Sequence, residues 1–163
     1  MKRILSVIIS FFFASLSNIA NAEGSSMGNQ NFIYEFEGSE DYVCELVSCE
    51  GNREKQEVIV KISISHTLPE HELRLAIWDA FTNDGEPYTS YIKEKTASDE
   101  FRWTQYETKH TIRTQRPKNI EIKINSVLPS HDKISVVLFK YSRYDISFKS
   151  GFVVIKNIPI NWN

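Results

Sequence analysis

The chain of 163 residues is poor in the residue types and motifs on which many enzymes depend, with only two cysteines, six glycines and five prolines. It contains no G-x-S-x-G turn for a serine nucleophile and no H-E-x-x-H zinc motif. A glycine-rich phosphate loop and a four-ligand zinc spacing are also absent. The motifs therefore predict no catalytic residue, no cofactor and no metal ion.

Long hydrophobic runs are absent after the first twenty residues, so no membrane span is predicted. The N-terminus itself has the order of a secretory signal, with Lys2 and Arg3 followed by the apolar run Ile4–Leu16. Small residues flank a cleavage point after Ala22. We therefore expect a cleaved signal peptide at 1–22, a flexible tail at 23–31, a single domain at 32–163, and a secreted or periplasmic location.

The chain also lacks an excess of positive charge, because 19 Lys and Arg face 21 Asp and Glu. Removing Lys2 and Arg3 with the signal lowers the formal net charge from −2 to −4. A mildly acidic protein has no general electrostatic attraction to nucleic acid. The expected partner is therefore a protein or a glycan.

Alternation of apolar and polar residues is the main structural signal in the chain. Within Val58–Asp79, apolar residues recur at every second position on both sides of a turn that contains Pro69. Successive strand side chains point to opposite faces, so this pattern predicts two strands, each with one apolar face. We interpret the stretch as a β-hairpin.

A weaker copy of this stretch lies at Ile120–Lys140, and it reflects either a duplication or the pattern that any strand–turn–strand unit has. Two such hairpins facing each other predict an all-β fold. The expected form is an antiparallel β-sandwich of about seven or eight strands, immunoglobulin-like or transthyretin-like. The predicted core comprises Val60, Ile62, Ile64, Leu75, Ile77, Ile122, Ile124, Val136 and Leu138.

The two cysteines, Cys44 and Cys49, are separated by four residues. In an oxidising compartment this spacing favours a disulfide that closes a small loop. The alternative is a redox-active or metal-binding pair, but redox pairs are usually closer and further metal ligands are not evident nearby. The sequence therefore predicts a structural disulfide.

The segment Arg102–Lys118 differs from the rest of the chain in having a local net charge of +4. If it forms one or two strands, it presents basic and aromatic side chains on an outward face, which suits an anionic or sugar-like ligand. The alternative is an edge strand whose basic residues prevent sheet-to-sheet pairing. The candidate binding residues are Arg102, Trp103, Tyr106, Lys109, Arg113 and Arg116.

Two further groups of polar residues lie in predicted turns. His71, Glu72, His131 and Asp132 occupy matching turns and approach a metal only if both turns meet at one end of the fold. Asp79, Asp84 and Glu86 surround the turn signal Asn83-Asp84-Gly85, without the spacing of a calcium-binding EF-hand. For both groups a solvated turn is the favoured interpretation over a metal site. Between them, Glu86–Glu100 is expected to be a loop or to contain a short helix around Ser90–Thr96.

These observations favour a non-enzymatic binding protein that recognises a protein or glycan partner through a surface patch, as an inhibitor, immunity or host-contact factor does. A structural subunit of a surface fibre or secretion apparatus is the alternative. Fibre subunits assembled by chaperones have an alternating apolar N-terminal extension, which Glu23–Asn31 lacks. A hydrolase whose carboxylates meet only in the fold is a third possibility.

Overall fold

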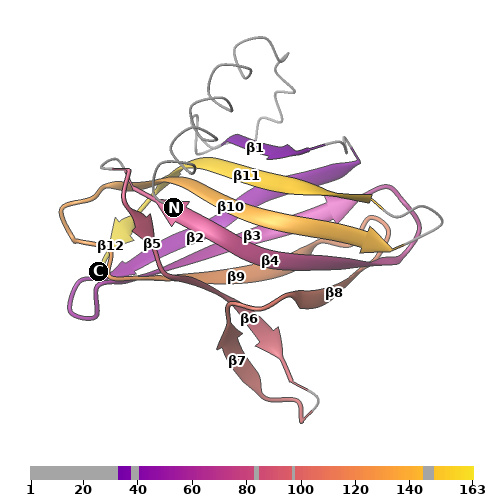
Figure 1. Ribbon diagram of the computed structural model, residues 1–163, viewed down its shortest axis with the longest axis horizontal. Coiled ribbons are helices and arrows are strands. Elements are labelled where there is room, and N and C mark those ends of the chain that lie inside the picture. The colour runs from indigo at the N-terminus through magenta and orange to yellow at the C-terminus, as the bar shows by residue number, and fades with distance from the viewer. Residues whose placement is uncertain (1–32, 38–40, 83–84, 97, 145–148) are drawn as a thin grey trace, which may run out of the picture. The chain divides into compact units, whose positions relative to one another are not determined.

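A computed structural model describes residues 33–37, 41–82, 85–96, 98–144 and 149–163, which belong to one compact unit (Figure 1). All regular secondary structure in these residues is β-strand, so the all-β class is confirmed. The predicted signal peptide and the whole of the predicted tail lie outside the described residues. Within the part that is described, no helix is long and apolar enough to cross a membrane.

Twelve strands are present in the described residues, against the seven or eight expected. The difference lies in four very short strands, because eight of the twelve have five or more residues. In chain order the strands are β1 (Ile33–Phe36), β2 (Tyr42–Asn52), β3 (Glu57–His66), β4 (His71–Phe81), β5 (Pro87–Tyr88), β6 (Ser90–Lys95), β7 (Phe101–Thr104), β8 (Thr108–Ile112), β9 (Lys118–Asn125), β10 (Lys133–Tyr144), β11 (Lys149–Pro159) and β12 (Asn161–Trp162).

The strands form two six-stranded sheets, which we call sheet A and sheet B. Sheet A has the order β1-β11-β10-β4-β5, and β8 also pairs with β4. Sheet B has the order β12-β2-β3-β9-β6-β7. All pairs are antiparallel except β12 with β2. The parallel pair brings Trp162 against Gly51, where a Cβ would lie 2.3 Å from the indole ring.

The predicted hairpin at Val58–Asp79 is wrong in its pairing, although both of its strands exist. β3 lies in sheet B and pairs with β2 and β9, whereas β4 lies in sheet A and pairs with β10. The predicted second hairpin behaves in the same way, with β9 in sheet B and β10 in sheet A. Each strand–turn–strand unit therefore crosses from one sheet to the other instead of folding back on itself.

The two crossing units are related by nearly symmetric pairing. In sheet B, Val60 pairs with Ile122 and Ile62 pairs with Ile120. Since Val60 corresponds in sequence to Ile120, and Ile62 to Ile122, the pairing is symmetric about the Lys61–Glu121 pair. In sheet A the equivalent strands β4 and β10 also pair antiparallel. This arrangement fits a duplication, and it also explains why neither unit needs an internal hairpin to bury its apolar residues.

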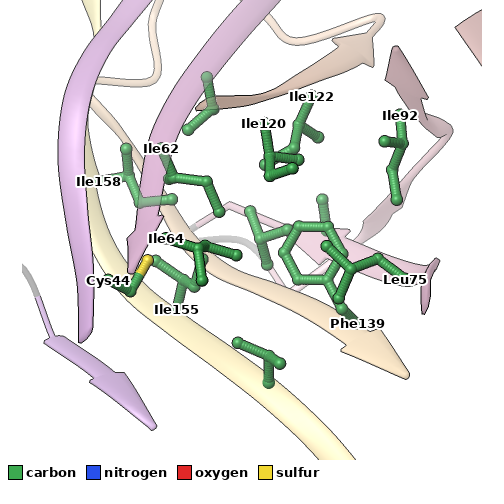
Figure 2. Close-up of a cluster of buried hydrophobic side chains, with 14 of the residues drawn as sticks. Cys44, Ile62, Ile64, Leu75, Ile92, Ile120, Ile122, Phe139, Ile155 and Ile158 are labelled. Atoms are coloured by element: carbon green, nitrogen blue, oxygen red, sulfur yellow. The ribbon is translucent and has the colours of Figure 1, made fainter. Parts of the chain in front are cut away.

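The core lies between the inner faces of the two sheets and is dominated by isoleucine (Figure 2). Six of the predicted core residues are buried, namely Val60, Ile62, Ile64, Leu75, Ile122 and Ile124. Ile77 is only half-buried. β-branched side chains pack well on pleated surfaces, and this accounts for the success of the alternation pattern in β3 and β9.

Val136 and Leu138 are not core residues, and their prediction as core was wrong. Both are half-buried on the outer face of sheet A, while Val137 and Phe139 point inward. In β10 every position from Val136 to Phe139 is apolar, so alternation cannot identify the inner face. The pairing with β4 also shifts between Leu138 and Phe139, where β4 bulges at Trp78.

The region Glu86–Glu100 contains no helix within the described residues, so the short helix considered around Ser90–Thr96 is wrong. Ser90–Lys95 instead forms β6, which pairs with β9 and with β7. The predicted turn is present at its described end, where Gly85 has a φ of +76° and its N–H donates to the carbonyl of Thr82 at 3.2 Å. Glycine adopts this backbone conformation without the steric cost of a side chain.

Candidate functional site

The hairpin of β6 and β7 projects away from the rest of the two sheets (Figure 1). Lys93 pairs with Trp103 across this hairpin, and both side chains point to the outer face of sheet B because their neighbours Ile92 and Thr104 are buried. At the tip, the N–H of Thr96 donates to the carbonyl of Glu100 at 2.7 Å. β6 and β7 therefore form a short, exposed two-stranded ribbon that is anchored in the core at one end.

Aromatic rings and lysines alternate on the outer face of this ribbon and of the adjacent strand β9. The Nζ atom of Lys93 lies 5.1 Å from the ring centroid of Phe101 and 5.8 Å from that of Trp103. The Nζ atom of Lys123 lies 5.3 Å from the centroids of both Tyr91 and Trp103. These distances are in the range of cation–π contacts. We call Tyr91, Lys93, Phe101, Trp103 and Lys123 the aromatic–lysine patch.

Carboxylates neutralise both lysines of the aromatic–lysine patch. Lys93 forms an ion pair with Glu121 at 2.8 Å, and Lys123 forms one with Glu57 at 3.6 Å. The patch is therefore not a strongly basic surface. Its distinctive chemistry is a group of aromatic rings with polar atoms around them, and Phe101 is 64% exposed to solvent.

The six binding residues predicted from the sequence are divided between the two sheets. Trp103 lies on the outer face of sheet B, whereas Lys109 lies on β8, which pairs with β4 in sheet A. Tyr106, in the connection between these strands, is 82% exposed. The structure therefore brings only Trp103 of the six into the aromatic–lysine patch.

The arginines of the predicted segment have acidic neighbours from other parts of the chain. Arg102 makes two hydrogen bonds to Glu94, at 3.0 and 2.9 Å, and Arg113 lies 3.2 Å from Glu70. Arg116 forms an isolated backbone bridge with Arg113. The local net charge of +4 is thus partly balanced in three dimensions, and the segment is not a single basic face.

The predicted disulfide between Cys44 and Cys49 is wrong, because both cysteines are free and buried. They belong to the same extended strand, β2, where Cys44 pairs with Ile64 and Cys49 with Val60. At a rise of about 3.3 Å per residue their Cα atoms lie roughly 15 Å apart, well beyond the ~7 Å limit for a disulfide. Burial, with a smaller contribution from the adjacent Glu45 and Glu50, raises the pKa of each thiol to about 12.

The two histidine-containing turns do not meet. β4 and β10 run antiparallel, with Tyr144 opposite Glu72 and Val136 opposite Phe81. His71 and His131 therefore lie at opposite ends of these strands. No group of three or more metal-ligating side chains occurs among the residues that the structure describes, and Asp84 of the considered calcium site is not one of those residues.

A buried polar cluster that the sequence did not predict lies near the start of β4. The hydroxyl of Tyr42 is 2.5 Å from Nε2 of His71, whose Nδ1 is 2.8 Å from the carbonyl of Pro69. His71 therefore donates from Nδ1 and accepts at Nε2. The ring of His66 lies 4.4 Å from that of His71, and Arg143 lies 3.6 Å from Asp41 at the edge of the same cluster.

His66 is the least satisfied member of this buried polar cluster. It is 3% exposed, and neither ring nitrogen has a hydrogen bond of standard geometry. Burial lowers the pKa of His66 below 6.5 and His71 and Arg143 lower it further, against the opposing effects of the Ile112 backbone and Asp41. The sequence shows His66 only as a strand end, because the residues that surround it come from β2, β4 and β10.

Comparison with known proteins adds little to this geometry. No protein family and no curated protein matches the chain. One solved structure with some similarity is a family 123 glycoside hydrolase from Clostridium perfringens, described for glycolipid glycan hydrolysis. The identity is 11%, the alignment covers 69% of this chain and 21% of that chain, and the TM-score is 0.33. The chain thus spans about a fifth of that protein, and so low a TM-score supports no conclusion on fold or activity.

Proposed function

We propose that this protein is an exported, non-enzymatic binding protein that recognises a glycan through the aromatic–lysine patch. Its fold is then a β-sandwich of the immunoglobulin-like or transthyretin-like kind, released after cleavage of the signal peptide at Ala22. The single observation that carries the proposal is the alternation of three aromatic rings with two lysines on the outer face of β6, β7 and β9.

Aromatic rings at a water-exposed surface suit a ligand that has both apolar and polar sides. A sugar ring has such a character, since its C–H groups pack on an aromatic ring while its hydroxyls form hydrogen bonds at the edge. Trp103 is half-exposed and lies at the centre of the patch. Phe101 lies two residues before it on β7, and Tyr91 lies on the paired strand β6. Tyrosine and tryptophan are enriched where one side of a contact is apolar and the other is wet.

The charges around the rings also suit a glycan. Lys93 and Lys123 are held by Glu121 and Glu57, so their remaining N–H groups are positioned to donate to ligand oxygens. The carboxylates supply acceptors for sugar hydroxyls. A surface with paired charges of both signs binds a neutral or weakly acidic sugar better than a strongly anionic polymer.

The position of the patch supports recognition rather than reaction. It lies on the open outer face of a sheet and on a projecting hairpin, where a long or surface-attached ligand can reach it without entering the protein (Figure 1). A fibre or secretion subunit and a hydrolase remain alternatives, but no described feature favours either of them specifically.

A glycan array compares the wild-type protein with Trp103→Ala and Phe101→Ala. We expect specific binding by the wild type and a loss of about tenfold or more in affinity for each variant, because each removes an aromatic contact worth more than 1 kcal/mol. The matched control is Tyr106→Ala, which removes an exposed ring outside the aromatic–lysine patch. We expect it to bind as the wild type does.

The same measurement distinguishes the three-dimensional patch from the linear segment predicted by sequence. The variant with both Arg102→Glu and Arg113→Glu changes the segment but not the patch. If this variant loses binding while Trp103→Ala retains it, the linear segment is the site and the aromatic–lysine patch is not. Failure of the wild type to bind any glycan contradicts the proposed ligand class.

A further inference from the structure

The outer face of sheet A is apolar at its centre, on β10 and β11, although the outer face of an antiparallel sheet is normally polar where it meets water. Val136 and Leu138 on β10 lie beside Phe152 and Val154 on β11, and Leu138 is paired with Val154. All four point away from the core, because the buried residues of these strands alternate with them at Val137, Phe139, Val153 and Ile155. We call Val136, Leu138, Phe152 and Val154 the outer apolar face.

β4 extends the outer apolar face with an aromatic residue. The bulge in β4 turns Trp78 outward, where it is 54% exposed and packs edge-on against Phe152 at 5.8 Å. Phe81, paired with Val136, is also directed outward because its neighbours Ala80 and Thr82 are buried. Trp78 is exposed and the other side chains of this contiguous apolar set are half-buried, and such a set at a protein surface suits an interaction with another molecule.

Sheet B shows that this apolarity is not a general property of the fold. On its outer face Lys61 pairs with Glu121 across β3 and β9, and Ile59 pairs with Lys123. Apart from the aromatic–lysine patch, the central strands of this face therefore carry the polar and charged residues expected of a solvated sheet. The central strands of sheet B therefore have no counterpart to the cluster of valine, leucine and phenylalanine on β10 and β11 of sheet A.

Four charged residues surround the outer apolar face, and within the described structure none of them has an ion-pair partner: Glu35, Asp79, Lys140 and Lys156. Asp79 is opposite Leu138, and Glu35 is opposite Val154. Burial raises the pKa of Asp79 above its ordinary value, with no neighbouring charge to oppose the effect. Two acids and two bases at the rim of an apolar surface, with no ion-pair partner among the described residues, can pair with oppositely charged groups of another molecule.

The positions of these four residues are self-complementary. With strands about 4.8 Å apart and a rise of about 3.4 Å per residue, the register places all four at roughly 7 Å from the midpoint between Val154 and Leu138. The acids lie on either side of this midpoint, and so do the lysines. Two different two-fold axes in the plane of the face satisfy these positions. One brings Asp79 of one copy opposite Lys156 of the other and at the same time Glu35 opposite Lys140, and the other exchanges the two lysines.

We propose that the outer apolar face is the interface of a homodimer, in which two copies pack through sheet A with Asp79 opposite Lys156 and Glu35 opposite Lys140. In a two-fold symmetric interface between identical copies each contact occurs twice, so each acid–lysine pair on this face forms two ion pairs in the dimer. The inference does not rest on the proposed glycan function. The aromatic–lysine patch lies on sheet B and stays exposed in such a dimer.

The N-terminal segment is the other part of this chain that is apolar enough to cover the face, through Ile4–Leu16. If the signal peptide is removed, residues 23–32 remain before β1, and only Met27 and Phe32 among them are large and apolar. The residues that remain after processing cannot supply an apolar cover of this size, so a second copy is the occupant that we infer. Occupation by the N-terminal segment or by a different protein predicts a monomer in purified processed material.

Analytical ultracentrifugation of the protein, expressed from its full sequence and purified, tests the proposal. We expect a dimer at about 100 μM and measurable dissociation on dilution toward about 1 μM, the affinity range of an interface of modest size. Leu138→Lys places a charge at the centre of the face and is expected to yield a monomer. The matched control Ile59→Lys makes the same kind of change on the outer face of sheet B and is expected to leave the dimer intact.

Charge exchange tests the assigned pairing. Asp79→Lys and Lys156→Asp are each expected to weaken the dimer by about tenfold, because each places like charges together twice. The variant with both changes is expected to recover the wild-type dimer constant. A monomeric wild type at about 100 μM, or a dimer that survives Leu138→Lys, overturns the interface, with circular dichroism confirming that each variant is folded. Failure of the double exchange to recover dimerisation overturns the pairing of Asp79 with Lys156.

Discussion

At the scale of single residues, the interior holds several titratable side chains in their neutral forms. Burial lowers the pKa of His110 from 6.5 to about 4, with a smaller effect of Lys118 in the same direction and an opposing effect of Glu94. Its Nε2 atom lies 2.8 Å from the hydroxyl of Thr108, which in turn donates to the carbonyl of Leu75 at 3.1 Å. Because the Thr108 hydroxyl proton is donated to the carbonyl of Leu75, Nε2 of His110 donates its own proton to the hydroxyl oxygen.

The lowered pKa values of His110 and His66 predict that acid destabilises the fold. An unfolded chain binds protons at histidines near pH 6.5, while the folded protein does not, so the free energy of unfolding falls as the pH drops below that value. For His110 the loss extends to about pH 4 and reaches roughly 2–3 kcal/mol. Urea unfolding at pH 7 and pH 4.5 measures it.

The variant His110→Gln isolates this contribution, since glutamine retains a hydrogen bond to Thr108 but does not titrate. We expect it to lose less stability than the wild type between pH 7 and pH 4.5, with His66 accounting for part of the remaining loss. An equal loss in both proteins would contradict the assignment to His110.

The buried thiols of Cys44 and Cys49 have a simple chemical consequence. Their pKa values of about 12 leave almost no reactive thiolate at neutral pH, and burial also blocks access. We expect both cysteines to be unreactive toward a thiol reagent in the native protein and to react fully in denaturant. A mass showing loss of the thiol hydrogens in the native protein would reveal a disulfide and contradict the extended geometry of β2.

At this scale, many of the residues that face the core could be predicted from the sequence. The prediction fails where apolar and polar residues no longer alternate. Ile62 and Ile122 stand between polar neighbours, so their strands can bury only one face. In β10 four successive apolar residues leave the choice between Val136 and Val137 open. The pairing with the bulged strand β4 then decides it, and this pairing is a property of the fold.

At the scale of elements, the crossing of the two strand–turn–strand units governs where the functional surfaces lie. A hairpin needs a turn that brings both strands into one sheet, and Leu68–Glu70 instead serves as a connection between sheets. Thr114 fixes this connection by donating to the carbonyl of Leu68 at 2.8 Å. Local sequence identifies both strands of such a unit but not the sheet to which each belongs.

The candidate site shows the same limit. The sequence marked Trp103 as a binding residue because it lies among basic residues in Arg102–Lys118. Its actual neighbours, Lys93 and Lys123, come from β6 and β9, on either side of that segment in the sequence. Cross-strand register brings them together, so no pattern within a single stretch of sequence reveals the aromatic–lysine patch.

At the scale of the whole molecule, the two outer faces have different compositions and suit different tasks. Sheet B carries the aromatic–lysine patch, whereas sheet A carries the outer apolar face, whose rim charges have no ion-pair partner among the described residues. A dimer formed through sheet A presents two patches at once. Two linked sites bind a repetitive or surface-attached ligand more tightly than either site alone.

Both functional proposals depend on the assignment of β3 and β9 to one sheet and of β4 and β10 to the other. This is the central structural claim, because a true hairpin of β3 with β4 places other residues on each outer face. For a chain of 18.9 kDa the pairing can be observed directly by nuclear Overhauser effects between backbone hydrogens in solution.

The most direct test is therefore the set of backbone Hα–Hα and amide–amide contacts made by β3 and β4. We predict contacts between the backbone hydrogens of Val60 and Ile122 and of Ile62 and Ile120, together with contacts of Leu75 to Tyr141. Backbone contacts that pair β3 with β4 in a continuous ladder would contradict the crossing units, and with them the positions of both surfaces.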